Sequence, residues 1–216
     1  MQQFNGLSIP TALEDLCDPR TTALLIYDMQ VGICTQVRES AGIMKRCQAA
    51  LTAARSAGMR VVFTRHLSSP KKWMGVTQLR TAMAWQRTVD AESVKPWFLR
   101  GSPSSEIVPE LAPTADDLVL DKLSMSAFEG TPLAYVLKDC DIVGLAIVGI
   151  AMEIGIEPTV RHATDLGVVP IILEDACGSG HAEAGARALE TMRFVGEAII
   201  SDVDNFQRLL SRAGQT

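Results

Sequence analysis

The stretch spanning residues 143–176 constrains the fold of this chain more than any other part of the sequence. It opens with VGLAIVGI, a continuous apolar run with the length and β-branched content of a strand buried on both faces of a parallel sheet. Apolar residues then recur at helical spacing over 154–166 until Gly167, a residue type that ends helices, and VVPIILEDA has the composition of the next buried strand. Because the carboxyl ends of strands in an open α/β sheet face the ligand crevice, the turn at 150–155 is expected to line an active site.

The rest of the chain repeats this alternation of strand and helix. The pattern predicts strands at 21–29, 59–66, 116–122 and 197–202, and helices at 42–57, 132–138, 181–194 and 203–213. Strands that alternate with helices form parallel sheets. We therefore predict an α/β fold with a Rossmann-like, doubly wound, mostly parallel sheet of about six strands and helices on both faces.

A single domain is expected over residues 1–216, since this length suits one hydrophobic core. Residues 1–20 have little pattern and are interpreted as an N-terminal arm. Residues 67–115 form a long connection that holds all three tryptophans, Trp73, Trp85 and Trp97. Connections of that length are commonly functional, so this one is a lid, an interface, or an excursion that the tryptophans pack onto the domain.

Composition and charge exclude several classes of function. The net charge of −5 leaves no basic patch for nucleic acid. No apolar run reaches membrane-spanning length and the first residues lack a signal pattern, so we expect a cytoplasmic protein that does not bind membranes. Five scattered cysteines fit free buried thiols in a reducing compartment better than disulfides or metal ligands: Cys17, Cys34, Cys47, Cys140 and Cys177.

Two charged residues are placed to meet at the carboxyl edge of this sheet. Asp28 ends the first predicted buried strand and Lys122 ends the third. With the turn at 150–155 they converge on one crevice, where a carboxylate and an ammonium bias each other's ionisation, as pairs at catalytic sites do. A structural interpretation also stands, with Asp28 as a helix N-cap or turn residue and the two as a structural ion pair.

Four segments in this order and spacing carry a resemblance: ALLIYDMQ, VLDKLSMSAFEGTPL, VGIAMEIGIEPTVRHATDLG and ILEDACGSG. They are similar to the isochorismatase-like hydrolases, also called the cysteine hydrolase family, over most of residues 20–200. The resemblance implies a Rossmann-like fold and a catalytic trio of aspartate, lysine and cysteine, in which Asp28 matches the aspartate and Lys122 the lysine. We also expect a small-molecule substrate, no cofactor, and a homo-oligomer that is either a dimer or a tetramer.

The cysteine of the trio is absent from its place. The resemblance puts the nucleophile directly before Ile156, where this chain has Gly155. Cys177 belongs to another strand end, and Cys34 follows Asp28 in a loop or first helical turn. Without a thiolate, covalent acyl transfer has no obvious nucleophile. Three hypotheses remain open: non-covalent hydrolysis, an amidase-type hydrolase that uses water or another cysteine, and a pseudo-enzyme that binds a small molecule. Retention of the charge pair, which is costly to bury, argues against the last.

A metal site is not predicted. The resemblance implies that nicotinamidase-like members carry an aspartate and histidine set with metal-ligand spacing after the second strand. This chain has His66 alone there, and we interpret an isolated histidine as structural.

One branch of the family, the true isochorismatases, resembles this chain in carrying glycine at the nucleophile position. In that chemistry the aspartate protonates the enol carbon of a vinyl ether, water adds to the oxocarbenium ion, and the hemiketal collapses to a ketone. Gly155 is therefore expected to lie at the catalytic centre, to leave room for a bulky ring, and to tolerate a Cβ. Substrate contacts are expected at Gln30, Gln78, Ala151, Met152, Glu153 and Ile154.

Two residues of the turn argue against a plain isochorismatase. Ala151 replaces a larger aromatic side chain of that branch. Glu153 places a second carboxylate where a dianionic substrate would be repelled, unless it is solvated or tied to Arg161 on the same helix.

The expected mechanism follows from these residues and the resemblance. Asp28 would act as general acid or base, and Lys122 would hold it and stabilise negative charge. Backbone N–H groups around Ile154 and Gly155 would form an anion site at the helix N-terminus. The resemblance places a non-proline cis peptide bond near 151–152, where it would aim those groups.

Overall fold

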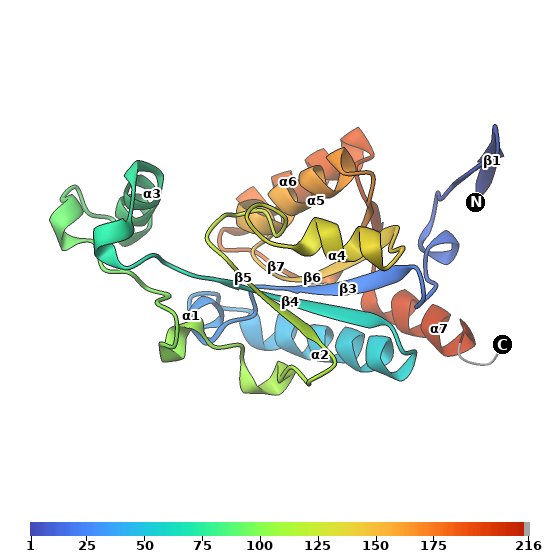
Figure 1. Cartoon of the computed structure of the whole chain (residues 1–216), viewed down its shortest axis with the longest axis horizontal. Coiled ribbons are helices and arrows are strands. Elements are labelled where there is room, and N and C mark those ends of the chain that lie inside the picture. Colours follow the sequence, from blue (N-terminus) through green and yellow to red (C-terminus); the bar gives the residue numbers. More distant parts are fainter. Residues whose placement is uncertain (214–216) are drawn as a thin grey trace.

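A six-stranded parallel sheet forms the centre of the computed structural model, which describes residues 1–213 (Figure 1). The last three residues of the domain expected over 1–216 lie outside the described part of the chain. The strands run in the order β5-β4-β3-β6-β7-β8. Their bounds are β3 Thr22–Tyr27, β4 Arg60–His66, β5 Leu118–Lys122, β6 Gly144–Ile150, β7 Val169–Gly178 and β8 Ile199–Ser201. The predicted fold class is confirmed.

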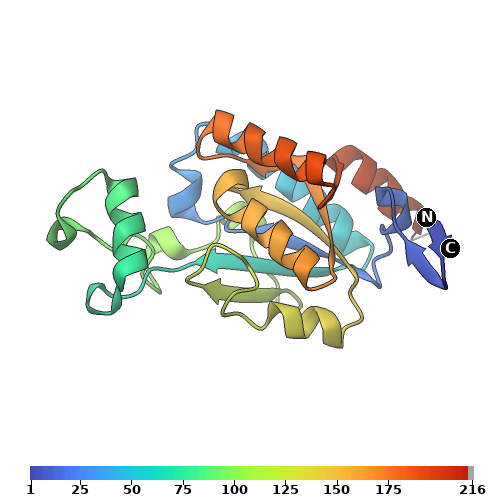
Figure 2. The same cartoon turned by 90° about the horizontal axis from the view of Figure 1, so that it is seen from above.

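Helices cover both faces of this sheet, as Figures 1 and 2 show. On one face lie α2 (Ser40–Ser56) and α7 (Val203–Ala213), and on the other lie α4 (Leu133–Asp139), α5 (Glu157–Asp165) and α6 (Ala182–Val195). Two short helices stand outside these layers, α1 (Val31–Cys34) and α3 (Val76–Gln86). A single π-helical turn, Met152–Ile156, joins β6 to α5.

Each face of the sheet buries its own apolar cluster. Leu24 and Ile26 of β3 point toward the α2 and α7 side, whereas Ala23, Leu25 and Tyr27 point toward the side of α4, α5 and α6. This alternation is the period of two that a strand imposes on successive side chains. The strand order reverses its direction between β3 and β6, so the ligand crevice is expected beyond the carboxyl ends of these two strands.

The N-terminal arm contains a β-hairpin that the sequence interpretation missed. Strands β1 (Gln2–Phe4) and β2 (Leu7–Ile9) pair antiparallel around Asn5 and Gly6. Both turn residues have positive φ, +48° and +78°. Asn-Gly favours the two-residue turn that matches the twist of paired strands. The dipeptide therefore indicated a hairpin, but the residues around it lack the apolar periodicity from which the other strands were predicted. All six strand residues are exposed to solvent.

The connection expected over 67–115 extends away from the sheet and carries its own helix α3 (Figures 1 and 2). None of the α3 residues is buried, and Trp73 is 77% exposed. Trp85 and Trp97 instead line cavities beside the sheet. The tryptophans therefore do not share one packing role.

No helix among residues 1–213 is long and apolar enough to cross a membrane.

A glycine at the end of β6 sets how closely the two central strands approach. Gly149 pairs with Tyr27 and has φ +127°, and a Cβ there would overlap the Tyr27 carbonyl oxygen and lie 2.8 Å from its nitrogen. We predict that Gly149→Ala lowers the free energy of unfolding by about 3 kcal/mol or more, because strain at positive φ and backbone overlap add. Urea denaturation followed by circular dichroism measures the change.

Gly167→Ala is the matched control for this prediction. Gly167 also has positive φ, +76°, but a Cβ there meets nothing within 4 Å. Only the left-handed backbone penalty of about 1 kcal/mol should remain. Equal losses in the two variants would contradict the steric role of Gly149.

Candidate active site

A buried ion pair joins two strand ends of the sheet. Asp28 directly follows β3 and Lys122 ends β5, and the Lys122 Nζ lies 2.7 Å from the Asp28 Oδ2. Strand β4 lies between them, and its Thr64 hydroxyl donates a 2.7 Å hydrogen bond to Asp28 Oδ1 and accepts one of 3.2 Å from the Asp28 N–H. Asp28 is 4% and Lys122 is 2% exposed. The structure thus brings together the two charges that the sequence predicts to converge.

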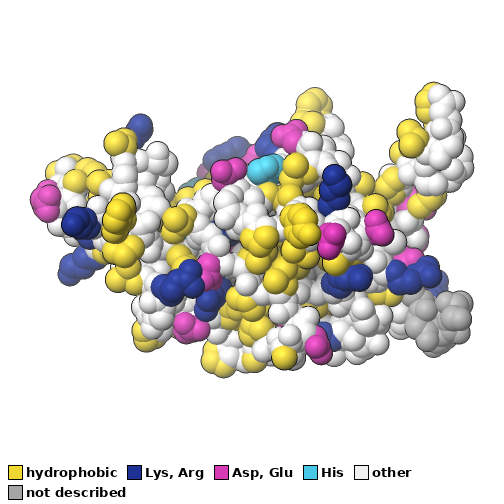
Figure 3. All heavy atoms as spheres, viewed as in Figure 1, with side chains coloured by type: hydrophobic (Ala, Val, Ile, Leu, Met, Phe, Trp, Pro, Cys, Tyr) yellow, Lys and Arg dark blue, Asp and Glu magenta, His cyan; other side chains and the backbone are white. Residues whose placement is uncertain are grey.

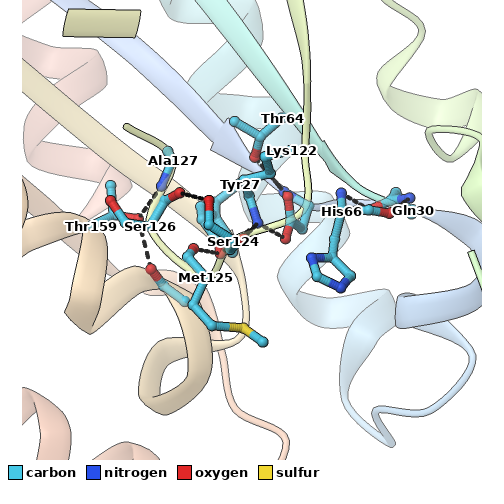
Figure 4. A network of polar contacts seen from close by, with 12 residues as sticks. Tyr27, Gln30, Thr64, His66, Lys122, Ser124, Met125, Ser126, Ala127 and Thr159 are labelled. Carbon is cyan, nitrogen blue, oxygen red and sulfur yellow. Dashed lines mark hydrogen bonds and ion pairs between the residues drawn. The ribbon is translucent and has the colours of Figure 1, made fainter. Parts of the chain in front are cut away.

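The ammonium of Lys122 has an acceptor for each of its three protons (Figure 4). Besides Asp28, it donates to the Tyr27 hydroxyl at 2.8 Å and to the Ser124 carbonyl oxygen at 3.1 Å. Burial lowers the pKa of Lys122, and the carboxylate of Asp28 opposes that shift. The side chain is therefore fixed in place and is a better proton donor than a solvated lysine.

The backbone of Asp28 is held in the left-handed region, with φ +47°. Such a conformation costs free energy in a residue other than glycine and is concentrated at functional sites. The bond between the Asp28 N–H and Thr64 keeps the residue there and aims its carboxylate along the carboxyl edge of the sheet.

Tyr27 fills the space beside Gly155. Its hydroxyl donates a hydrogen bond to the Met125 carbonyl oxygen while it accepts one from Lys122. A Cβ built on Gly155 would overlap the phenol oxygen and Cζ of Tyr27 and lie 2.5 Å from its Cε1. The expectation that Gly155 leaves room for a substrate ring and tolerates a Cβ is therefore wrong, because a buried aromatic side chain already occupies that volume.

A cavity of about 350 Å³ lies next to the ion pair, and we call it the Asp28 cavity. Asp28 and Tyr27 line it from the sheet, Ala151 and Ile154 from the turn after β6, and Arg87 from the end of α3. The remaining lining residues are largely apolar or aromatic: Ile33, Gln36, Val37, His66, Trp85, Trp97, Phe98, Met125, Ile150 and Gly180. Sheet, turn and long connection all contribute to this one cavity.

Gln78, a predicted substrate contact, lines a second cavity of about 300 Å³ under α3. We call this the Gln78 cavity. The two cavities share a wall of five residues: His66, Trp85, Trp97, Phe98 and Met125. Gln78 and Asp28 therefore line different cavities, which meet at these five residues.

Two other predicted substrate contacts lie outside the Asp28 cavity. Gln30 is fully buried, and its amide group bonds to the backbone of His66 and Ser105 at 2.7–3.0 Å. Its polar atoms thus tie the segment after β3 to β4 and to the long connection. Met152 is 3% exposed and packs in the apolar cluster under α4, α5 and α6.

Glu153 caps the next helix. Its Oε1 accepts a 2.7 Å hydrogen bond from the N–H of His181, the residue before α6. Arg161, the alternative partner, pairs instead with Glu157 and Glu197, each at 2.8 Å. The expected ion pair between Glu153 and Arg161 is therefore wrong, because Arg161 is already paired with Glu157 on α5 and with Glu197, which follows α6. Glu153 does not line the Asp28 cavity.

The turn after β6 differs in detail from the expected anion site. The N–H of Gly155 donates to the Ala151 carbonyl oxygen at 3.0 Å and is not free. Within the described chain, the amides of Glu153 and Ile154 have no hydrogen-bond acceptor, as expected for a first helical turn. The cis peptide bond joins Ile150 to Ala151, one bond before the expected place.

His66 lines both cavities, a position that its isolation in the sequence did not indicate. Its ring packs edge-on against Trp85 and Phe98, with centroids 6.4 and 5.9 Å away, within the wall between the cavities. Burial, and then the charge of Lys122, lower the pKa of His66, so the ring is neutral at pH 7. Residues 1–213 contain no group of three or more His, Cys, Asp and Glu side chains that could hold a metal ion.

Comparison with known proteins identifies the family. The family model described as the Isochorismatase domain matches residues 22–204. The chain belongs to the isochorismatase family of hydrolases. The match includes the whole six-stranded sheet, the buried ion pair and every residue that lines the Asp28 cavity.

Solved structures of this family share the fold. A cysteine hydrolase from Pseudomonas syringae pv. phaseolicola is 24% identical with a TM-score of 0.77, covering 90% of this chain and 94% of its own. An isochorismatase family protein from Desulfovibrio vulgaris subsp. vulgaris is 22% identical with a TM-score of 0.74, covering 89% and 100%. The pyrazinamidase of Pyrococcus horikoshii in complex with zinc is 22% identical with a TM-score of 0.70, covering 84% and 99%.

Cys34 and Cys177, the two alternative nucleophiles in this isochorismatase-family chain, are poorly suited to that role. Burial raises the pKa of Cys34 to about 11 and that of Cys177 well above its ordinary value. Neither residue lines the Asp28 cavity. Neither of these two thiols is thus available as a nucleophile, by position or by ionisation.

We predict that iodoacetamide leaves turnover largely intact while the protein stays folded. The half-buried Cys140, at the end of α4, is expected to be labelled before Cys34 and Cys177. Mass spectrometry maps the labelled site, and a turnover assay on the same samples gives the residual activity. Stoichiometric inactivation that tracks labelling of Cys34 or Cys177 would contradict this assignment.

Proposed function

We propose that this protein hydrolyses a small organic substrate without a covalent enzyme intermediate, with Asp28 as general acid and base and Lys122 as its partner. One observation carries the proposal: among the described residues that line the Asp28 cavity, Asp28 is the one carboxylate and none is a cysteine. A positioned carboxylate next to a buried ammonium supports proton transfer, whereas acyl transfer of the cysteine hydrolase kind needs a thiolate.

The reaction proposed is cleavage of a vinyl ether. Asp28 gives its proton to the terminal enol carbon, which leaves an oxocarbenium ion at the ether carbon. Water adds to that carbon and returns a proton to Asp28, and the hemiketal then expels the alcohol to leave a ketone. One water is consumed, and one alcohol and one ketone are formed. Lys122, whose pKa is lowered by burial, donates to Asp28 Oδ2, passes that proton to Asp28 at the start of a turnover, and takes it back once water has returned a proton to the carboxylate.

The Asp28 cavity supports an anionic substrate with a flat apolar part. Arg87 lines the cavity and has no ion-pair partner among residues 1–213. Trp85, Trp97 and Phe98 provide aromatic surface on the same side. The carboxylate of Glu153, which argued against a charged substrate, faces the N-terminus of α6 instead. We propose a carboxylate-bearing vinyl ether of the isochorismate kind.

We predict that Asp28→Asn lowers kcat by at least about 100-fold, the usual scale for a general acid or base. Asparagine keeps the shape and one acceptor oxygen for Lys122, so the variant should fold. Turnover of isochorismate by the purified full chain measures the effect, with circular dichroism as the folding check. A folded variant with near-parental kcat would contradict the role of Asp28.

Asp121→Asn is the matched control. Asp121 precedes Lys122 on β5, but its carboxylate pairs with Arg65 at 2.8 Å and lies outside the Asp28 cavity. It should retain turnover. A panel of amides assayed beside the vinyl ethers tests the amidase hypothesis, and binding of either class without turnover would favour the pseudo-enzyme.

We also propose that the protein acts as a homo-oligomer. Phe4 and Leu7 of the N-terminal hairpin are each 63% exposed, and Val76 of α3 is 76% exposed. Figure 3 shows hydrophobic side chains on both of these projecting parts. Exposed apolar groups of this kind mark protein interfaces.

Sedimentation velocity of the full chain should give the mass of a dimer or tetramer. Combined Phe4→Ser and Leu7→Ser substitutions should raise the dissociation constant of that oligomer at least about tenfold, since each removes apolar contact area. A monomer across micromolar concentrations would contradict the proposal.

A further inference from the structure

We propose that Tyr27 determines the type of reaction at this site: its phenol takes the space of a side chain at residue 155 and serves as a fixed acceptor for Lys122. The inference deepens the proposed function and rests on it for its catalytic meaning. On this inference residue 155 is glycine because Tyr27 occupies the space of a side chain there, whereas the sequence interpretation gave Gly155 the role of making room for the substrate.

The steric part rests on where the phenol lies. Tyr27 is 2% exposed and packs among the apolar residues under α4, α5 and α6. A Cβ on Gly155 would overlap its oxygen and Cζ and lie 2.5 Å from Cε1. These atoms belong to a buried ring whose oxygen is bound on two sides, so the ring cannot move aside as a flexible surface side chain would. Any residue but glycine at 155 must therefore displace Tyr27.

The polar part rests on what the phenol oxygen contacts. It accepts from Lys122 Nζ at 2.8 Å and donates to the Met125 carbonyl oxygen, and Nζ lies 4.4 Å from the centre of the ring. Burial, and then the charge of Asp28, raise the pKa of Tyr27 well above its ordinary value, so the group remains a neutral phenol. A neutral phenol held this way acts on the substrate through Lys122, as a positioning residue.

The two parts together explain how the charge pair persists without a thiol. The phenol oxygen fills the third acceptor position of Lys122 at the point where a side chain on residue 155 would begin. Removal of the outer ring atoms should open that point, and a thiol placed on residue 155 would then lie close to the ammonium. An ammonium lowers the pKa of a neighbouring thiol.

Five variants of the full chain separate these claims: Gly155→Cys alone, Tyr27→Leu alone, Tyr27→Phe alone, Tyr27→Leu with Gly155→Cys, and Tyr27→Phe with Gly155→Cys. Leucine removes the phenol oxygen, Cζ and Cε1, whereas phenylalanine keeps both ring carbons that Gly155→Cys would meet. The last variant is therefore the matched control. The readouts are melting temperature and the rate of iodoacetamide labelling at residue 155, mapped by mass spectrometry over a range of pH.

We expect Gly155→Cys to lower the melting temperature by about 5 °C or more in the parent and in the Tyr27→Phe background, from overpacking. In the Tyr27→Leu background the further loss should be less than about 2 °C, and the new thiol should label with an apparent pKa below the ordinary value of about 8.5. Equal losses in all three backgrounds would overturn the steric claim. If the thiol is well tolerated beside leucine but has an ordinary or raised pKa, the claim that a side chain on residue 155 lies close to the Lys122 ammonium would be overturned.

A pH profile tests the positioning claim. The phenol oxygen stabilises the charged form of Lys122, so Tyr27→Phe should lower the pKa of Lys122 and move the basic limb of the kcat profile to lower pH, with KM within about threefold. An unmoved limb would overturn the claim. The stability and labelling readouts use no substrate, so they can fail while Asp28→Asn behaves as proposed, and they can succeed if the vinyl ether assignment fails.

Discussion

The ion pair between Asp28 and Lys122 is the interaction on which the rest of the structure depends. Two charges that are 4% and 2% exposed lose several kcal/mol of hydration each, and a short contact offsets this only when the remaining polar atoms are also bonded. Three neighbouring strands meet that requirement, with Asp28 after β3, Thr64 on β4 and Lys122 on β5. Their register is consequently part of the site, because a slip of β5 by one residue would turn the lysine to the other face of the sheet.

Much of this could be predicted from the sequence. Long apolar runs and helical spacing are properties of contiguous residues, and they were sufficient for the sheet, its helices and the convergence of Asp28 with Lys122. The relation between Tyr27 and Gly155 could not be predicted, because it brings a side chain of β3 against a backbone position in the turn after β6, and the approach of β3 and β6 depends on backbone geometry at Gly149. The roles of Gln30 and Glu153 were missed for a similar reason: a polar residue near a site has the same sequence pattern whether it faces ligand or backbone.

The long connection after β4 gives the site its apolar side. The sheet supplies the charges, but Trp85, Trp97 and Phe98 come from a segment that extends away from the sheet and whose helix α3 has no buried residue. Segments with little buried surface open at low free energy, so α3, which carries Trp85, is expected to be less stable than the strands that carry the charges. The charges are thus placed by the sheet, and the shape offered to the substrate depends also on the long connection.

The overlap between Tyr27 and a side chain at residue 155 also constrains how such a site could arise. A chain with cysteine at residue 155 has no space for the phenol, so a tyrosine at residue 27 would have been excluded while the thiol was present. In any lineage that starts with cysteine at residue 155, its replacement by glycine must come before tyrosine can occupy residue 27. Return to the thiol is blocked until the tyrosine shrinks again. The volume of one buried ring therefore fixes the order of the two substitutions and opposes their reversal.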